Sequence, residues 1–159
     1  MPSTILSNGN EHDEFGFTTI DPIKVVAMSD KRFRKSDALA QEISTLDPVK
    51  IFGDTNPDIT LVGWGSTKGP ALEAIRLLKE EGKMVNFIQI VYLEPFPSEA
   101  MKEAMKNSGR SLLLETNVTN QLERLVKEKT SIKFDKSFTK YSGRPFNPYE
   151  IAIEARRLL

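Results

Sequence analysis

Apolar and polar residues alternate along most of this chain in a pattern that predicts strands and helices in turn. Four short apolar runs bounded by turn residues indicate buried strands, at residues 49–52, 59–64, 84–93 and 111–115. Such runs are typical of a parallel sheet that is covered on both faces. Residues 132–138 alternate apolar and polar positions instead, which predicts an edge strand protected by Lys133 and Lys136.

Between these strands, apolar residues recur at helical spacing, so the strands are expected to be joined by helices. Residues able to cap a helix N-terminus precede four of these segments: Thr67, Ser98, Thr119 and Asn147. Val118 is placed on the inner side of the third helix. Gly82 and Gly109 are predicted to end the first and second helices, because glycine adopts the left-handed conformation without strain. Glu150 completes a capping box with Asn147 at the start of the last helix.

The first 47 residues differ from the rest of the chain. Residues 1 to about 23 are polar and interrupted by glycine, which predicts an arm that is ordered only in part. A linker helix is expected from about Val25 to Thr45, before Asp47-Pro48. The chain therefore divides into an N-terminal arm with its linker helix, 1–47, and a compact domain, 48–159. Alternating strands and helices predict that this domain is α/β, with a mostly parallel sheet and helices on both faces.

Composition excludes several kinds of chemistry. The 159 residues include no Cys and one His, so the chain offers no thiolate nucleophile, no Cys ligands for an iron–sulfur cluster and no His-based zinc site. No metal site is predicted. The 22 basic and 22 acidic side chains balance, and nucleic-acid binding is therefore not expected. The chain shows neither a signal-peptide pattern nor an apolar run of membrane-spanning length, which predicts a cytoplasmic protein without membrane contact.

A glycine-rich loop lies between the second predicted strand and the helix that follows it. Gly63, Gly65, Ser66 and Thr67 belong to this loop, which runs to Gly69. Backbone amides in such a position bind phosphate in many α/β proteins, so the loop is a candidate phosphate or nucleotide site. Its G-x-G-x-x-x-G spacing matches neither the dinucleotide fingerprint nor a P-loop. We favour the simpler interpretation, in which the glycines permit a tight turn and close helix–sheet packing.

Glu94 and Glu115 follow or end predicted buried strands. In an open α/β sheet such positions face the ligand crevice, where a pair of carboxyl groups could transfer protons. No nucleophile, metal ligand set or His accompanies them. We favour hydrogen bonding to neighbouring loops as the role of these two residues.

Three charged segments are candidates for contact with a partner. His12 lies among Glu11, Asp13 and Glu14, which favour its protonated form, and it either faces a partner or is simply solvated. Arg32 belongs to the basic run 31–35, which either contacts phosphate or an acidic partner or forms the solvated side of a helix. The loop 143–148 carries Arg144 and either anchors an interface or forms a rigid turn before the last helix.

Several short motifs occur in an order that resembles one protein family. The linker after the pyrimidine-binding domain of the alpha subunit of 2-oxoacid:ferredoxin oxidoreductases is similar to Glu11-His12-Asp13-Glu14-Phe15-Gly16, followed by Asp21-Pro22, Met28 and Lys31-Arg32. The C-terminal domain of that subunit is similar to four later motifs: Gly63-Trp64-Gly65-Ser66, Tyr92-Leu93-Glu94-Pro95-Phe96-Pro97, Glu115-Thr116-Asn117 with Gln121-Leu122, and Gly143-Arg144-Pro145-Phe146. The resemblance covers nearly the whole chain, from about Asn10 onward.

This resemblance implies a fold like the C-terminal domain of transketolase. Such a domain is a three-layer α/β/α sandwich with a five-stranded, mostly parallel sheet, in which the first strand is antiparallel and the order is 1-3-2-4-5. The family oxidatively decarboxylates a 2-oxoacid with coenzyme A. Thiamine diphosphate supports the carbanion chemistry, and electrons leave through iron–sulfur clusters to ferredoxin.

The resemblance further implies that the chain is the C-terminal part of the alpha subunit, without the pyrimidine-binding domain. In the family, thiamine diphosphate and Mg²⁺ are held by the beta subunit, and the clusters lie in other chains or domains. We therefore expect no cofactor on this chain alone, no catalytic residue and no turnover by the isolated chain. Its expected role is assembly with the remaining alpha-subunit domain and the beta subunit, with ferredoxin as an indirect partner. The interface candidates are Glu11, His12, Asp13, Glu14, Arg32 and Arg144.

Two alternatives remain open. One is a free-standing α/β domain that binds a phosphate-containing ligand at the loop Gly63–Gly69. The other is the product of a decayed gene, which folds but has no function.

Overall fold

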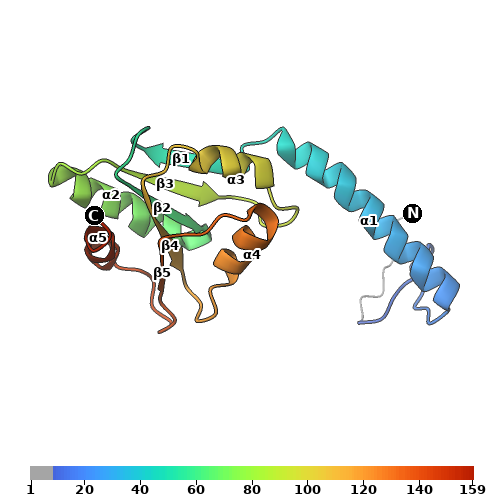
Figure 1. Ribbon diagram of the computed structural model, residues 1–159. Coiled ribbons are helices and arrows are strands. Elements are labelled where there is room, and N and C mark those ends of the chain that lie inside the picture. The colour runs from blue at the N-terminus through green and yellow to red at the C-terminus, as the bar shows by residue number, and fades with distance from the viewer. Residues whose placement is uncertain (1–8) are drawn as a thin grey trace. The chain divides into compact units, whose positions relative to one another are not determined.

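Five strands form one mixed sheet in the part of the chain that the computed structural model describes, residues 9–159 (Figure 1). The strands are β1 (Val49–Gly53), β2 (Ile59–Trp64), β3 (Val85–Ile90), β4 (Arg110–Glu115) and β5 (Lys136–Thr139). Their order is β1-β3-β2-β4-β5. β1 pairs antiparallel with β3, and the other neighbouring pairs are parallel. Both the order and the antiparallel first strand confirm the fold that the family resemblance implied.

One helix precedes the first strand in the sequence, and four helices each follow one of the strands β2 to β5. They are α1 (Pro22–Ser44), α2 (Lys68–Glu80), α3 (Ser98–Met105), α4 (Gln121–Thr130) and α5 (Pro148–Arg156), with a short 3₁₀ helix η1 at Gly65–Thr67. Successive residues of a strand face opposite sides of the sheet. Leu61 therefore packs in the core that α2 and α5 cover. Its neighbour Val62 packs in a second core with Met101 of α3 and Leu122 of α4. The domain is thus a three-layer sandwich.

The chain divides between Thr45 and Leu46 into two units. The smaller unit consists of α1 and the loop before it, in which His12 and Thr18 form an isolated antiparallel bridge. Asp21 caps α1 by accepting a hydrogen bond from the Ile23 amide at 2.9 Å. This cap and Pro22 start the helix three residues before the predicted Val25. The part of the predicted arm at residues 1–8 lies outside the described residues.

Of the four predicted helix caps, one is confirmed, one is right in position only and two are wrong. Thr67 occupies the N-cap position of α2, but its hydroxyl donates to the Trp64 carbonyl at 2.7 Å and makes no cap hydrogen bond. Ser98 is the first residue of α3 and its side chain makes no cap hydrogen bond. At α4, Asn117 rather than Thr119 accepts the hydrogen bond from the amide of Gln121, at 3.3 Å. The capping box at Asn147 is confirmed.

The α4 region holds two further corrections. Val118 is 62% exposed, because α4 begins only at Gln121 and Val118 lies in the loop before it. The predicted edge strand exists, but it begins at Lys136 and pairs parallel with β4. Lys133 lies before this strand. Among residues 9–159 no helix is both long and apolar enough to cross a membrane.

Candidate functional site

The carboxyl ends of β2 and β4 lie side by side, and they bring Trp64 and Glu115 together. Glu115 is fully buried. One of its carboxyl oxygens accepts a hydrogen bond from the Leu122 amide at 2.7 Å, and the other accepts one from the Trp64 indole at 3.3 Å. The buried carboxyl group therefore connects the end of the sheet to the first turn of α4. Glu94, the other half of the predicted pair, is exposed on the loop after β3. This geometry favours the structural interpretation of both residues.

The glycine-rich loop forms η1 and is tightly packed at one point. A Cβ atom at Gly63 would lie 2.5 Å from the Thr67 hydroxyl and 3.3 Å from the Phe87 ring. Thr67 is buried, whereas Gly65 and Ser66 are exposed. The ammonium group of Lys68 lies 4.5 Å from the centre of the Phe52 ring. The only basic side chain of the loop is thus engaged in a cation–π contact. These contacts support the packing role, and a phosphate site here stays a prediction.

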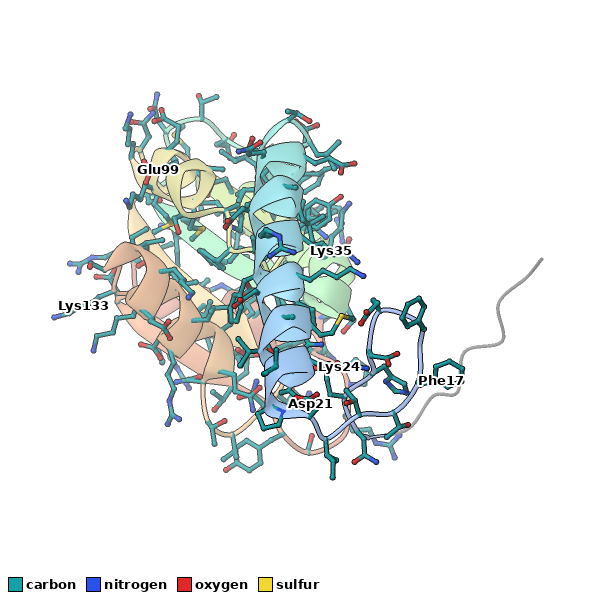
Figure 2. The ribbon with its side chains drawn as sticks, turned by 90° about the vertical axis from the view of Figure 1, so that its right-hand side faces the viewer. Phe17, Asp21, Lys24, Lys35, Glu99 and Lys133 are labelled. Atoms are coloured by element: carbon teal, nitrogen blue, oxygen red, sulfur yellow. The ribbon has the colours of Figure 1, made fainter. Side chains whose placement is uncertain are left out.

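The acidic segment before α1 contacts the helix directly. Asp13 is buried, and one of its oxygens accepts hydrogen bonds from the amides of Phe15 and Phe17 at 3.1 and 3.0 Å. The other oxygen pairs with the ammonium group of Lys24 at 3.0 Å. This ammonium group holds the pKa of Asp13 below its ordinary value. Figure 2 shows Lys24 on the first turns of α1, beside the loop that carries Phe17.

The same segment uses Arg32 in a second ion pair. The Arg32 guanidinium donates to both carboxyl oxygens of Glu11, at 2.9 Å in one of the two hydrogen bonds. Glu14 is exposed. His12 is half-buried, and its Nε2 atom has no hydrogen-bond partner among the described residues. Five of the six predicted interface residues therefore lie in the smaller unit, where Glu11, Asp13 and Arg32 fix the loop onto α1.

This contact predicts a pH-dependent change in the smaller unit. The Arg32 guanidinium, with the His12 amide, lowers the pKa of Glu11 to about 2 from its ordinary 4.5. A carboxyl group whose pKa is lowered on folding stabilises the fold above its ordinary pKa and loses that effect as the pH falls through the lower value. We expect NMR titration to show Glu11 ionising near pH 2, and Arg32→Gln to return it toward 4.5. Lys35→Gln, on the same helix, is the matched control. An unchanged titration in Arg32→Gln would contradict the ion pair.

Arg144 lies apart from this segment in sequence, on the loop between β5 and α5. Phe146 of the same loop is buried and its ring centre lies 5.0 Å from that of Phe138. Arg144 itself is exposed. The loop is thus anchored through Phe146, and an interface role for Arg144 stays a prediction.

The donor groups of the described residues do not form a site for a metal ion or an iron–sulfur cluster. In residues 9–159 no three His, Asp or Glu side chains gather where they could hold a metal ion. The chain has no Cys for a cluster. Residues 9–159 are therefore assigned no role in holding Mg²⁺ or an iron–sulfur cluster.

A row of polar residues inside the sheet was not predicted from the sequence. Asn86, Thr60 and Ser111 are paired across β3, β2 and β4, and all three are buried. The available signal was the presence of Asn86 and Thr60 within otherwise apolar runs, since polar groups in such positions need hydrogen-bond partners.

Known proteins resemble this chain in both sequence and fold. The family model described as "Transketolase, C-terminal domain" matches residues 49–121. The alpha subunit of 2-oxoacid:ferredoxin oxidoreductase 2 from Aeropyrum pernix is 36% identical over 157 residues, which cover 99% of this chain and 24% of that protein. The crystal structure of the alpha chain of a probable 2-oxoacid ferredoxin oxidoreductase from Thermoplasma acidophilum is 34% identical, with a TM-score of 0.50. The match covers 70% of this chain and 96% of that one.

The chain belongs to the family of 2-oxoacid:ferredoxin oxidoreductase alpha subunits. A larger relative of known structure is the 2-oxoglutarate:ferredoxin oxidoreductase from Magnetococcus marinus, which was solved with 2-oxoglutarate, coenzyme A and succinyl-CoA bound. That match has a TM-score of 0.73 and 26% identity, and it covers 97% of this chain and 26% of that one. The chain thus spans about a quarter of the length of the Aeropyrum and Magnetococcus relatives. The family prediction is confirmed.

Proposed function

We propose that this chain serves as the transketolase C-terminal-like segment of a 2-oxoacid:ferredoxin oxidoreductase alpha subunit and acts in assembly. The proposed complex decarboxylates a 2-oxoacid with coenzyme A and passes electrons to ferredoxin. Thiamine diphosphate, Mg²⁺ and the iron–sulfur clusters are held by other domains or chains of that complex. The proposal rests on one observation: a relative that aligns over 99% of this chain, at 36% identity, is an alpha subunit of this enzyme. A cytoplasmic location stays a prediction.

The side chains of the described residues support an assembly role better than a catalytic one. Glu115 is occupied by hydrogen bonds to Leu122 and Trp64, so it is not free to exchange protons with a substrate. The smaller unit instead exposes many large apolar side chains: Phe15, Phe17, Ile20, Ile23, Val26 and Phe33. Grouped apolar residues left in water are typical of surfaces that other protein covers. The proposed partners are the remaining alpha-subunit domain and the beta subunit.

This proposal predicts that the chain alone does not turn over. The purified chain should give no 2-oxoacid-dependent reduction of ferredoxin with pyruvate or 2-oxoglutarate, in the presence of thiamine diphosphate, Mg²⁺ and coenzyme A. A tagged chain purified from its source cell should bring down a beta subunit and the remaining alpha-subunit domain, identified by mass spectrometry. Turnover by the purified chain would overturn the assigned role.

A matched pair of variants tests whether the exposed apolar residues form the interface. Phe33→Glu should reduce recovery of the beta subunit at least tenfold, because it places a charge where an apolar side chain is buried on assembly. Val118→Glu, at an exposed position of the larger unit, is the control and should leave recovery unchanged. Equal recovery with both variants would place the interface elsewhere.

A further inference from the structure

One side of α1 presents two adjacent rows of exposed side chains. Members of each row recur every seven residues, which brings them to one side of the helix, since seven residues make nearly two turns. The first row is apolar and the second carries two carboxyl groups: Val26, Phe33 and Ala40, and Ile23, Asp30 and Asp37. We call this surface the α1 seam, because its spacing is that of the contact positions of a coiled coil.

The loop before α1 contacts a different side of the helix. Its carboxyl groups pair with Lys24 and Arg32, and the half-buried Met28 lies between these two residues on the helix. Met28 precedes Phe33 by five residues, which places it about 140° away round the helix. The loop therefore leaves the seam open, and the side chains of Val26 and Phe33 are 59% and 75% exposed.

The two carboxyl groups of the seam are not balanced by a basic side chain. Neither Asp30 nor Asp37 forms an ion pair with another residue of the range 9–159. Arg34 lies one helical turn after Asp30 and does not pair with it. Glu11 and Asp13 of the same unit, in contrast, each pair with a basic residue of α1. The seam thus combines apolar side chains with uncompensated negative charge.

This charge decides against a second copy of the chain as the occupant of the seam. In two parallel copies, equivalent positions face each other, so Asp30 and Asp37 would each meet their own counterpart. In antiparallel copies each Asp would be buried against the apolar row without a counter-ion, which is costly. Only a surface that brings its own positive charge covers the seam without either penalty.

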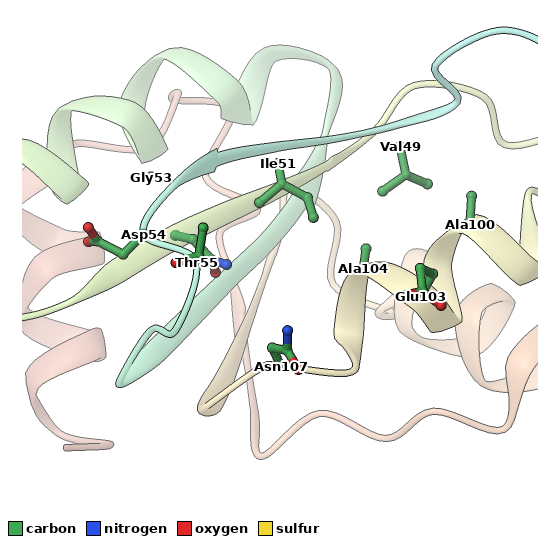
Figure 3. A pocket seen from close by; sticks show the side chains of 10 residues that line it. Val49, Ile51, Gly53, Asp54, Thr55, Ala100, Glu103, Ala104 and Asn107 are labelled. Carbon is green, nitrogen blue, oxygen red and sulfur yellow. The ribbon is translucent and has the colours of Figure 1, made fainter.

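The cavity of the larger unit lacks such uncompensated charge. This cavity, of about 580 Å³, lies between β1 and α3 (Figure 3). Its charged lining residues are Asp54 and Glu103, which already pair with Lys79 and Lys106. The cavity therefore offers a partner no unpaired charge to match, unlike the α1 seam.

We propose that the α1 seam binds an apolar surface of a partner subunit that carries Lys or Arg at the positions facing Asp30 and Asp37. The inference rests on the proposed function, in which that partner belongs to the same oxidoreductase. Burial of Val26 and Phe33 supplies most of the affinity. The two carboxyl groups select the partner and its register, because any other apolar surface would leave them buried and unpaired.

The test is calorimetric titration of the full chain into one probe, the recombinant complex of the beta subunit and the remaining alpha-subunit domain. Asp30→Lys should raise the Kd about tenfold, because it turns an attraction across the interface into a repulsion. Asp30→Glu keeps the charge and should stay within about twofold of the unchanged chain. Both positions are exposed, and circular dichroism checks that the helix is retained.

Glu42→Lys is the matched control for Asp30→Lys. It makes the same change of charge on the same helix, at an exposed position nine residues after Phe33 and so about half a turn away from it. Its Kd should equal that of the unchanged chain. Raising NaCl to about 1 M, where charges are screened beyond about 3 Å, should weaken the unchanged chain more than a variant with both Asp30→Asn and Asp37→Asn.

The outcomes separate this inference from the assembly role. Tight binding by the unchanged chain together with equal Kd values for Asp30→Lys and Glu42→Lys would overturn the inference and leave the assembly role intact. No binding by the unchanged chain would count against the assembly role itself, and the inference would fall with it. A dimer of the chain alone that Phe33→Glu dissociates, measured by analytical ultracentrifugation, would make a second copy the occupant and would also overturn the inference.

Discussion

Replacing Glu115 with Gln is expected to lower the free energy of unfolding of the larger unit by about 1–3 kcal/mol, the cost of leaving a buried hydrogen-bonding group unsatisfied. Both carboxyl oxygens accept hydrogen bonds, one from the Leu122 amide and one from the Trp64 indole. Gln keeps only one oxygen. Its NH₂ group then faces a donor, and the residue is fully buried, so water cannot replace the lost acceptor.

Urea unfolding followed by tryptophan fluorescence measures this effect in the correct unit. Trp64 is the only tryptophan of the chain and lies on β2, so its emission reports on residues 46–159. Glu94→Gln makes the same chemical change at an exposed position and should alter the free energy of unfolding by less than about 0.5 kcal/mol. If Glu115→Gln is as mild as Glu94→Gln, the carboxyl group does not hold the end of the sheet.

Glu94 and Glu115 also show what a sequence can and cannot predict about a site. Both residues were predicted as site candidates by the same rule, which places residues at strand ends near the ligand crevice. That rule gives position along a strand, but not whether a neighbouring group already occupies the side chain. The Trp64 indole comes from a strand 51 residues earlier, so its contact with Glu115 depends on the sheet order and not on local sequence.

The strands were easier to predict than the helix starts for a similar reason. The run 59–64 coincides with β2, because burial on both faces leaves a continuous apolar segment. A helix start, in contrast, depends on the backbone conformation of one or two residues, which the apolar pattern does not reveal. Asn120 adopts a left-handed conformation with φ of 50°, which moves the start of α4 past Thr119 to Gln121. The strand order came from the family resemblance, since periodicity alone does not order strands.

Gly82 and Gly109 were both predicted to end a helix, but only Gly82 does so. Gly82 follows α2 with φ of 76°, so the predicted left-handed helix end is confirmed. Gly109 is different, because α3 already ends at Met105. A Cβ atom at Gly109 would lie 2.2 Å from the carbonyl oxygen of Asp58 and 2.4 Å from that of Pro57. Gly109 is therefore required by the close approach of two backbone segments, which no local pattern reveals.

This close approach predicts that Gly109→Ala lowers the free energy of unfolding by about 3 kcal/mol, the upper end of the usual cost of overpacking. The added methyl group meets backbone atoms, which cannot move without disturbing the hydrogen bond from the Arg110 amide to the Asp58 carbonyl, 2.9 Å long at the start of β4. Urea unfolding followed by Trp64 fluorescence measures this loss of stability in Gly109→Ala.

Gly69→Ala is the matched control for Gly109→Ala. Gly69 lies in the first turn of α2, and a Cβ atom there would have no neighbour within 4 Å apart from its adjacent residues and the backbone of its own helix. Alanine in a helix loses less conformational entropy on folding than glycine, but its Cβ atom is disfavoured directly before Pro70, so this variant should change the free energy of unfolding by less than about 1 kcal/mol. The two substitutions are chemically identical, and only Gly109→Ala is expected to destabilise the unit strongly. A loss in Gly69→Ala comparable to that in Gly109→Ala would mean that the backbone contact with Asp58 is not the cause.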